Sequence, residues 1–233
     1  MVKERSLINV RSFWYFLLSF PTLNDRFLLS NIRQLTGCSM KQIAEAFFSL
    51  EGKMRYLKHM QRALHNYGLQ PSMFGKKGIV LYVLVKLLKP SIVVETGVEH
   101  GVSTSFILMA LEDNNYGKLF SIDIPSNTLP KRKVSGWLIP EGLKQRWSLL
   151  IGRSKDILKP LLSQLSTIDI FFHDSEHTYY NMLYEYLVAY QHLREGGILL
   201  SDDVSLNKAF FDFCAIVHRK PIRFSFGLGG ISV

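Results

Sequence analysis

The chain has 233 residues, 47% of them hydrophobic, so it is long and apolar enough to bury the core of one ordinary domain, and general disorder is excluded. Two widely separated cysteines, Cys38 and Cys214, argue against a disulfide framework and favour a reducing cytoplasm. The apolar run at 12–20 is far shorter than the roughly 20 residues of a membrane span, so we expect no transmembrane segment. We interpret the run as a buried helix, with a membrane-surface helix as the alternative.

The net charge of +9 is unevenly distributed along the chain. Residues 1–90 hold 14 Lys and Arg against 4 Asp and Glu, whereas residues 91–233 hold 14 against 15. Such a basic segment is either a solvated helical face or a surface for an acidic partner, such as nucleic acid, anionic lipid or a phosphorylated substrate. No recognised nucleic-acid module selects among these alternatives.

Residues 1–74 predict a basic, helical N-terminal segment. Ser39 is placed to cap a helix, and apolar residues follow it at three- and four-residue spacing. A further short helix, closed by Pro90, begins the second unit, which comprises residues 75–233.

From residue 91 onward, strand-like and helical segments alternate. Strands are expected at 91–97, 118–124, 146–152, 168–174 and 196–203, and helices at 103–113, 154–165, 178–193 and 207–219. Residues 222–233 are typical of two short strands around a Gly-rich turn, added antiparallel at one edge. The alternation predicts an α/β fold: a Rossmann-like, doubly wound, mostly parallel seven-stranded sheet with helices on both faces.

Residues 124–147 form a long irregular piece between two expected core strands, with three prolines and a basic cluster at 131–133. Loops of this length inside a compact domain are usually functional or mobile. We therefore consider this segment a candidate lid or substrate loop, in which Trp137 and Arg146 either pack the loop or face a substrate.

Acidic side chains stand at the ends of four of the five expected parallel strands. They are Glu95, Asp123, Asp174 and the pair Asp202–Asp203. In open α/β sheets, ligands bind beyond the carboxyl ends of the strands. Gly97 and Gly101 let the backbone pass close to a ligand at a helix start, and Asp123 is placed to bind ribose hydroxyls. Because the spacing is not G-x-G-x-x-G, S-adenosylmethionine is favoured over NAD, and the carboxylates would favour its sulfonium cation.

Four segments resemble the class I S-adenosylmethionine-dependent O-methyltransferases of the catechol and caffeoyl-CoA type, over about residues 75–233. The pattern E-x-G-x-x-x-G-x-S matches residues 95–103, G-x-S-x-D matches 152–156, an aspartate with a base three residues later matches 174–177, and G-G-x-x-x-x-D matches 196–202. The C-terminal part and the long loop are similar to the macrolide sugar O-methyltransferases and the cephalosporin-hydroxylase-like group.

The resemblance implies roles for individual residues. Cofactor binding is implied for Glu95, Gly97, Gly101, Ser103, Asp123, Ser154 and Asp174. A divalent metal is implied on Asp174, Asp202 and Asp203, an all-oxygen set suited to Mg²⁺. Asp174 and His177 would be catalytic, with His177 as general base. Catechol-type enzymes have lysine where this chain has His177 and the macrolide sugar enzymes have histidine, so an aliphatic, sugar-like hydroxyl is favoured over a catechol.

A simpler alternative is that these side chains only cap helices, with Asp174, Ser175 or Thr178 at the helix 178–193 and Asp202 or Ser205 at the helix 206–219. His173 is expected to pack or hydrogen-bond inside the fold, and Glu176 to be a solvated charge.

The sequence thus predicts a metal-assisted O-methyltransferase for a hydroxyl of a small molecule or glycan. Two alternatives stay open: an RNA or lipid methyltransferase recruited by the basic N-terminal helices, and a catalytically inactive cofactor-binding interaction protein. The methyl acceptor and the formation of a homo-oligomer are also left open.

Overall fold

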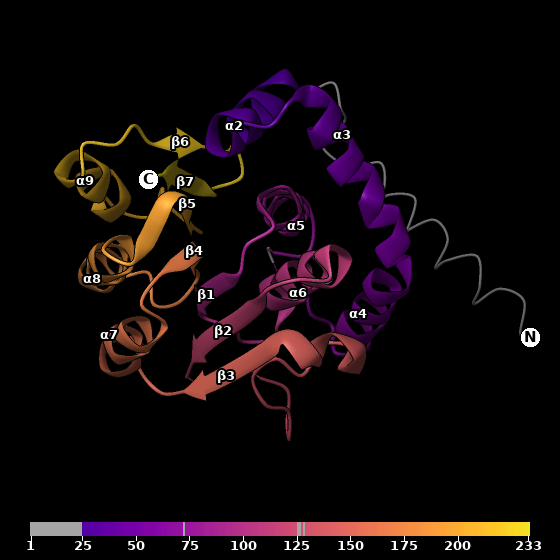
Figure 1. The fold of residues 1–233 in the computed structure, drawn as a ribbon. Coiled ribbons are helices and arrows are strands. Elements are labelled where there is room, and N and C mark those ends of the chain that lie inside the picture. Colours follow the sequence, from indigo (N-terminus) through magenta and orange to yellow (C-terminus); the bar gives the residue numbers. More distant parts are fainter. Residues whose placement is uncertain (1–24, 72, 125–126, 128) are drawn as a thin grey trace, which may run out of the picture.

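The computed structural model describes residues 25–71, 73–124, 127 and 129–233 (Figure 1). The apolar run at 12–20 lies outside these residues. The N-terminal part contains α2 (Arg26–Thr36), α3 (Met40–Ser49), the 3₁₀ turn η1 (Leu50–Lys53) and α4 (Met54–Asn66). Ser39 caps α3 as predicted, because its hydroxyl accepts from the Gln42 N–H and the Gln42 side chain accepts from the Ser39 N–H.

The rest of the chain alternates between strands and helices, as the sequence predicts. In chain order the elements are α5 (Lys76–Leu88), β1 (Ile92–Thr96), α6 (Val102–Asn114), β2 (Lys118–Asp123), η2 (Glu141–Arg146), β3 (Trp147–Ile151), α7 (Ser154–Leu165), β4 (Ile168–His173), α8 (Tyr179–Tyr190), β5 (Leu193–Ser201), α9 (Ala209–Ile216), β6 (Ile222–Arg223) and β7 (Gly229–Ser232). Among these described residues, no helix has both the length and the apolar character that crossing a membrane requires. Both cysteines are free thiols.

Within the described part of the chain, the strands form one seven-stranded sheet in the order β3-β2-β1-β4-β5-β7-β6. Strands β1 to β5 pair in parallel, and β7 pairs antiparallel with both β5 and β6. This confirms the predicted doubly wound sheet with an antiparallel addition at one edge. The strand order reverses direction between β1 and β4, which makes their carboxyl ends the expected place for a ligand.

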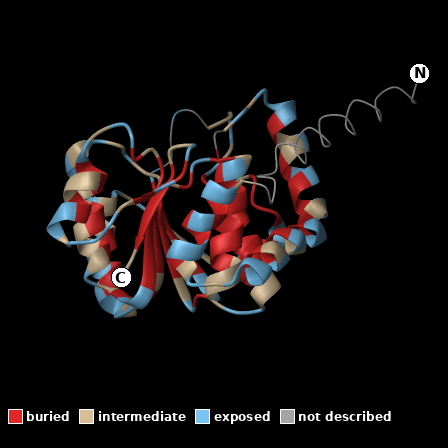
Figure 2. Cartoon of the chain, turned by 90° about the horizontal axis from the view of Figure 1, so that it is seen from above, coloured by how far each residue is buried: buried red, intermediate tan, exposed pale blue. Residues whose placement is uncertain are grey.

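Helices cover both faces of the sheet because its strands are apolar on both sides. Successive residues of one strand, such as Val93 and Val94, belong to different apolar clusters. The first cluster joins the sheet to α5, α6 and the N-terminal helices, and the second joins it to α7, α8 and α9. Figure 2 shows buried residues running through the strands and along the helix faces that meet them.

The N-terminal helices pack against the outer side of α5 and α6 and share their apolar cluster. Lys53 of η1 is buried and lies 2.8 Å from a carboxylate oxygen of both Glu112 and Asp113 on α6. The side-chain amide of Asn31 on α2 donates to the carbonyl of Arg223 in β6. The division of the chain at residue 74 stays a prediction.

Candidate active site

A cavity of about 770 Å³ lies beyond the carboxyl ends of the parallel strands, within the size range of small-molecule sites. Its wall contains most of the predicted site residues: Gly97, Ser103, Asp123, Ser154, Asp174, His177, Asp202 and Asp203. Glu95 and Gly101 do not line it. The topology therefore gathers at one place residues that are far apart in the sequence.

Two backbone hydrogen bonds just beyond the carboxyl ends of the strands fix the positions of Asp174 and Asp202. The Asp174 N–H donates to the carbonyl of Thr96 and the Asp202 N–H to the carbonyl of His173, each over 2.8 Å. Gly97 has a φ of +86°, and an added Cβ would lie only 2.0 Å from the Asp174 carbonyl oxygen. Glycine is thus required at position 97 by close backbone approach, as its place in the motif suggests.

Asp123 ends β2 with its carboxylate turned toward the glycine-containing loop that follows β1. One carboxylate oxygen accepts from the Val98 N–H at 3.1 Å and the other from the Glu99 N–H at 3.3 Å. These bonds hold the carboxylate at the cavity wall before any ligand arrives, which is the position that the ribose-binding prediction requires. Ser154, the first residue of α7, donates to the side chain of Asn181 at 3.3 Å.

Glu95 lies beneath the cavity and is fully buried. Its carboxylate accepts hydrogen bonds from the hydroxyls of Ser103, Thr104 and Ser121, at 2.6 to 2.8 Å. Burial raises the pKa of Glu95 to about 7 despite these three donors. Glu95 therefore fixes the loop and helix that form the cavity wall, while its predicted direct contact with the cofactor stays a prediction.

Gly101 is the N-cap residue of α6, and its φ is +86°. An added Cβ would lie 2.8 Å from the Cα of Gly136. Glycine at position 101 therefore lets the long loop pack closely against the loop that follows β1. The Gly136 N–H donates to the carbonyl of Glu99 and the Leu138 N–H to that of His100. The described part of the long loop is thus tied to the cavity rim, and its role as a lid or substrate loop stays a prediction.

Trp137 and Arg146 pack this loop rather than line the cavity. The indole N–H of Trp137 donates to Nδ1 of His100 at 3.2 Å. The guanidinium of Arg146 donates to the side chain of Asn115 at 2.7 Å, on the far side of α6. Both side chains therefore hydrogen-bond to neighbouring segments of the fold, and contact with a substrate stays a prediction.

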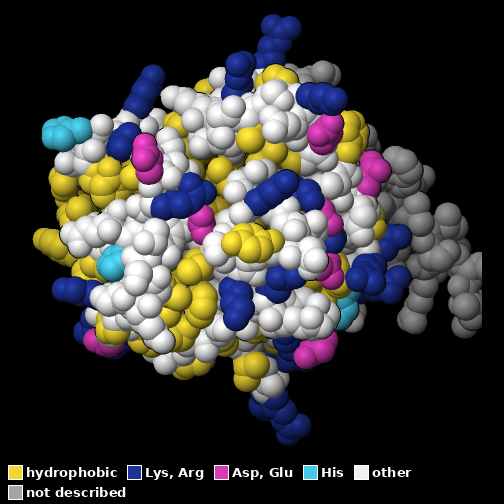
Figure 3. Space-filling view, in the orientation of Figure 1, with side chains coloured by type: hydrophobic (Ala, Val, Ile, Leu, Met, Phe, Trp, Pro, Cys, Tyr) yellow, Lys and Arg dark blue, Asp and Glu magenta, His cyan; other side chains and the backbone are white. Residues whose placement is uncertain are grey.

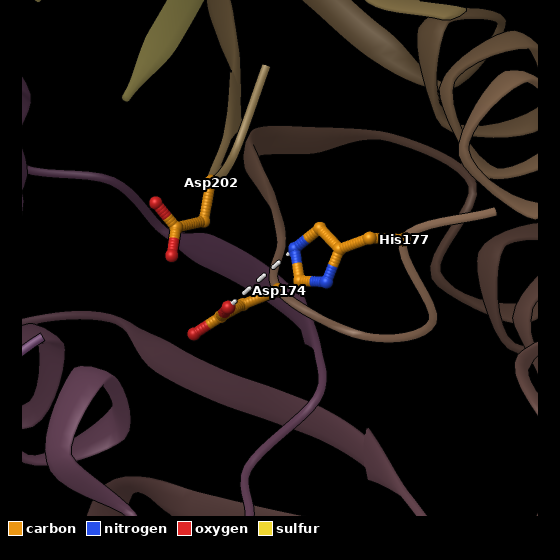
Figure 4. Close-up of side chains that lie close together, drawn as sticks. All are labelled: Asp174, His177 and Asp202. Atoms are coloured by element: carbon orange, nitrogen blue, oxygen red, sulfur yellow. Dashed lines mark ion pairs between the residues drawn. The ribbon is translucent and has the colours of Figure 1, made fainter. Parts of the chain in front are cut away.

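Asp174, His177 and Asp202 form a cluster in which one ligand-type atom from each lies within 4.8 Å of the others (Figure 4). His177 Nε2 is 3.9 Å from Asp174 Oδ1, is buried and has no hydrogen-bond partner in the structure. Burial and the neighbouring His173 lower the pKa of His177, so the neutral, proton-accepting form persists below the ordinary range. Burial and the carboxylates of Asp202 and Glu95 raise the pKa of Asp174.

Helix capping does not explain these side chains. The N-cap residue of α8 is Thr178 and that of α9 is Lys208, and neither makes a side-chain cap hydrogen bond. The Ala209 N–H at the start of α9 instead donates to Asn207 Oδ1. The capping alternative is therefore wrong for Asp174 and Asp202.

The structure brings together only two members, Asp174 and Asp202, of the predicted magnesium set of Asp174, Asp202 and Asp203. Asp203 is not in the cluster, and its Oδ1 lies 3.2 Å from the Nζ of Lys77, a residue that the sequence interpretation does not single out. The same Nζ lies 2.6 Å from Asp202 Oδ1. The cluster replaces the third oxygen with the His177 imidazole, whereas Mg²⁺ prefers oxygen ligands. Ligation through Nε2 would also remove the lone pair that a proton acceptor needs.

Glu185 is a second site-supporting residue that the sequence interpretation misses. It is fully buried on α8, and its carboxylate is 2.7 Å from His173 Nδ1 and accepts from Ser175 Oγ at 2.8 Å. Burial opposes its ionisation, but the bonds from His173 and its other donors outweigh this effect, and the pKa of Glu185 is lowered. His173 is buried as predicted and Glu176 is exposed as predicted. In the sequence, the sign that Glu185 has a buried role is that it is the one acidic residue in the stretch 179–190, which is otherwise mostly apolar.

Residues 94–204, a little under half of the chain, match the family model described as a methyltransferase domain. The matched segment runs from within β1 to just beyond β5 and so contains the strand ends that form the cavity. No curated protein matches the sequence.

Three solved structures share the fold. The methyltransferase PaMTH1 of Podospora anserina, bound to S-adenosylhomocysteine, is 15% identical with a TM-score of 0.55, and the match covers 77% of this chain and 86% of that one. The O-methyltransferase TomG of Streptomyces achromogenes, involved in tomaymycin synthesis and in complex with S-adenosylmethionine, is 17% identical with a TM-score of 0.57, and the match covers 76% of this chain and 89% of that one. An O-methyltransferase of Bacillus cereus in complex with S-adenosylhomocysteine is 14% identical with a TM-score of 0.52, and the match covers 77% of this chain and 91% of that one. At these identities the likeness establishes the fold.

Replacing Gly97 by alanine should destabilise the protein by at least about 2 kcal/mol, because the new methyl group meets backbone and no side-chain rotation relieves the clash. The free energy of unfolding in urea measures this loss. Gly52→Ala is the matched control, because an added Cβ at that position has nothing within 4 Å. Similar stability of the two variants would contradict the close approach of the β1 and β4 ends.

Glu95 should make stability fall between about pH 4.5, its ordinary pKa, and about pH 7, its pKa in the fold. The folded state holds a proton in this window that the unfolded state releases, so the contribution is full below the window and lost above it, by about 3 kcal/mol. Glu95→Gln should flatten this part of the stability–pH curve in urea unfolding. An unchanged slope in the variant would show that Glu95 does not titrate in this window.

Proposed function

We propose that the protein is an S-adenosylmethionine-dependent O-methyltransferase that acts on a hydroxyl of a small molecule or glycan, with His177 as general base. The observation that carries the proposal is the position of His177: it lines the same cavity as the residues of the cofactor motifs, and its Nε2 has no hydrogen-bond partner among the described residues. The names of the structural neighbours, two of them O-methyltransferases, support the reaction type.

The cofactor would lie along the carboxyl ends of β1, β2 and β4. Asp123 would accept hydrogen bonds from the ribose hydroxyls, Ser154 would contact the adenine and Asp174 the methionine end. Gly97 and Ser103 line the wall of the cavity that would hold this ligand. A cationic sulfonium beside Asp174 would favour the ionised form of this acid, which burial disfavours, whereas a phosphate-rich cofactor would be repelled by the neighbouring carboxylates.

When bound, S-adenosylmethionine supplies a methyl group on a sulfonium centre. The protein has to orient the acceptor hydroxyl toward that group and remove its proton. His177 Nε2 would accept this proton, and the lowered pKa of His177 keeps the ring neutral and ready to do so. The nearby Asp174 carboxylate, 3.9 Å away, would stabilise the imidazolium that results. Mg²⁺ assistance, which the sequence predicts, is not part of the proposed reaction because the donor set does not fit the ion.

A second candidate role, recruitment to an acidic partner such as RNA or anionic lipid, is favoured by the surface of α4. Arg55, Lys58, His59 and Arg62 line a shallow groove there of about 400 Å³. Figure 3 shows Lys and Arg side chains on this face of the molecule, some of them where α4 lies. A helical groove lined by basic side chains is suited to phosphate groups.

Replacing His177 by glutamine should leave the affinity for S-adenosylhomocysteine within about twofold and lower methyl transfer by about 10²-fold or more. Calorimetry measures the affinity, and labelling of metabolite and glycan pools by methyl-tritiated S-adenosylmethionine measures transfer. His65→Gln, at an exposed position on α4, serves as the control. Undiminished labelling by the His177 variant would remove the base assignment, and no binding of S-adenosylhomocysteine by the unaltered protein would remove the proposed function.

If α4 recruits an acidic partner, the protein should bind an RNA oligonucleotide or anionic vesicles with an affinity that falls steeply with salt. The double variant Lys58→Glu/Arg62→Glu should lose this binding. Lys118→Glu/Lys159→Glu changes the net charge equally at exposed positions elsewhere and should retain it. Equal losses in both variants would indicate a general charge effect, and no binding by the unaltered protein would indicate a solvated basic face.

A further inference from the structure

A lysine ammonium occupies the place where the predicted metal ion would neutralise paired carboxylates. Lys77 lies in the first turn of α5, and its side chain is only 9% exposed. Its Nζ is 2.6 Å from Asp202 Oδ1 and 3.2 Å from Asp203 Oδ1. One buried cation thus bridges the two acids that follow β5.

Negative charge gathers at the carboxyl ends of these strands, and Lys77 supplies a positive charge there. Asp174, Asp202 and Asp203 come from adjacent strand ends, and burying several carboxylates together is costly unless a cation compensates them. The N-terminus of α5 adds the positive end of a helix dipole on the same side as Lys77. The compensating charge is therefore supplied by the fold itself.

A divalent ion would have to share Asp202 with this ammonium. Mg²⁺ binds carboxylate oxygens at about 2.1 Å, so the two cations would compete for one small carboxylate and repel each other. Asp203, the other expected ligand, is bonded to Lys77 and lies outside the cluster. Lys77 and a metal ion are therefore alternatives.

We propose that Lys77 takes the place of the divalent cation, so that the cavity binds its cofactor and supports methyl transfer without a metal. Lys77 is a positioning residue: it holds Asp202 and Asp203 and, through them, the cavity wall opposite Asp174. This inference rests on the proposed function for its link to methyl transfer, but the exclusion of a metal ion is testable separately.

The test combines titration with Mn²⁺, followed by electron paramagnetic resonance, and calorimetry with S-adenosylhomocysteine in metal-free buffer. The unaltered protein should show no stoichiometric Mn²⁺ binding, and added Mg²⁺ should change the affinity for S-adenosylhomocysteine by less than about twofold. Lys77→Ala should free the carboxylates and bind roughly one equivalent of Mn²⁺. Lys77→Arg, which keeps the cation, and Lys76→Ala, which removes the exposed neighbouring lysine, should bind none.

Stoichiometric Mn²⁺ binding by the unaltered protein, or an affinity for S-adenosylhomocysteine that rises about tenfold with Mg²⁺, would overturn the inference. So would a Lys77→Ala variant that is folded by circular dichroism and still binds no Mn²⁺. If that variant does not fold, the unaltered protein and Lys77→Arg still decide the question. Absence of S-adenosylhomocysteine binding would count against the proposed function, while the Mn²⁺ result would still test the role of Lys77.

Discussion

The compensation of buried carboxylates at the end of an apolar sheet is the constraint on which the rest of this structure depends. Strands β1, β4 and β5 are apolar on both faces, yet each leads into an acid that faces the same cavity or lies just beneath it. Three acids at this edge have their own compensating groups: hydroxyls for Glu95, backbone N–H groups for Asp123, which ends β2, and an ammonium for Asp202. Because each group comes from a different element, the helices and loops around the cavity must be in place together.

The same arrangement lowers the pKa of His177, the proposed general base. His177 is near three aspartates, which would favour its protonated form, but its burial and the adjacent His173 outweigh them and lower its pKa. Glu185 orients His173 from below through a bond of 2.7 Å. Lys77, which lies against Asp202 and Asp203, also lowers the pKa of His177 through its own positive charge. The proposed base therefore depends on residues from α5 and α8 that do not touch it.

The sheet and the membership of the cavity were predictable, because apolar runs ending in acids specify both the strands and the edge at which their ends meet. The sequence did not predict which of the carboxylates lie together in one cluster. Asp202 and Asp203 are equivalent in the sequence, yet only Asp202 joins the cluster with Asp174 and His177. Lys77 is likewise indistinguishable in sequence from Lys76, since its burial depends on the rotation of α5 against the sheet. Basic residues at a helix start oppose the helix dipole, which was the available hint of nearby acids.

Ion pairs inside the molecule explain part of the uneven charge of the chain. Lys53, Lys77 and Lys86 belong to the basic residues 1–90, and each lies within 3.5 Å of a carboxylate from residues 91–233. Part of the basic excess therefore neutralises acids of the same molecule across the packing of α5 and η1 on the sheet domain, a role that neither a solvated face nor an acidic partner describes. Basic side chains also gather at the groove on α4, so an external acidic partner would be sought first at that helix.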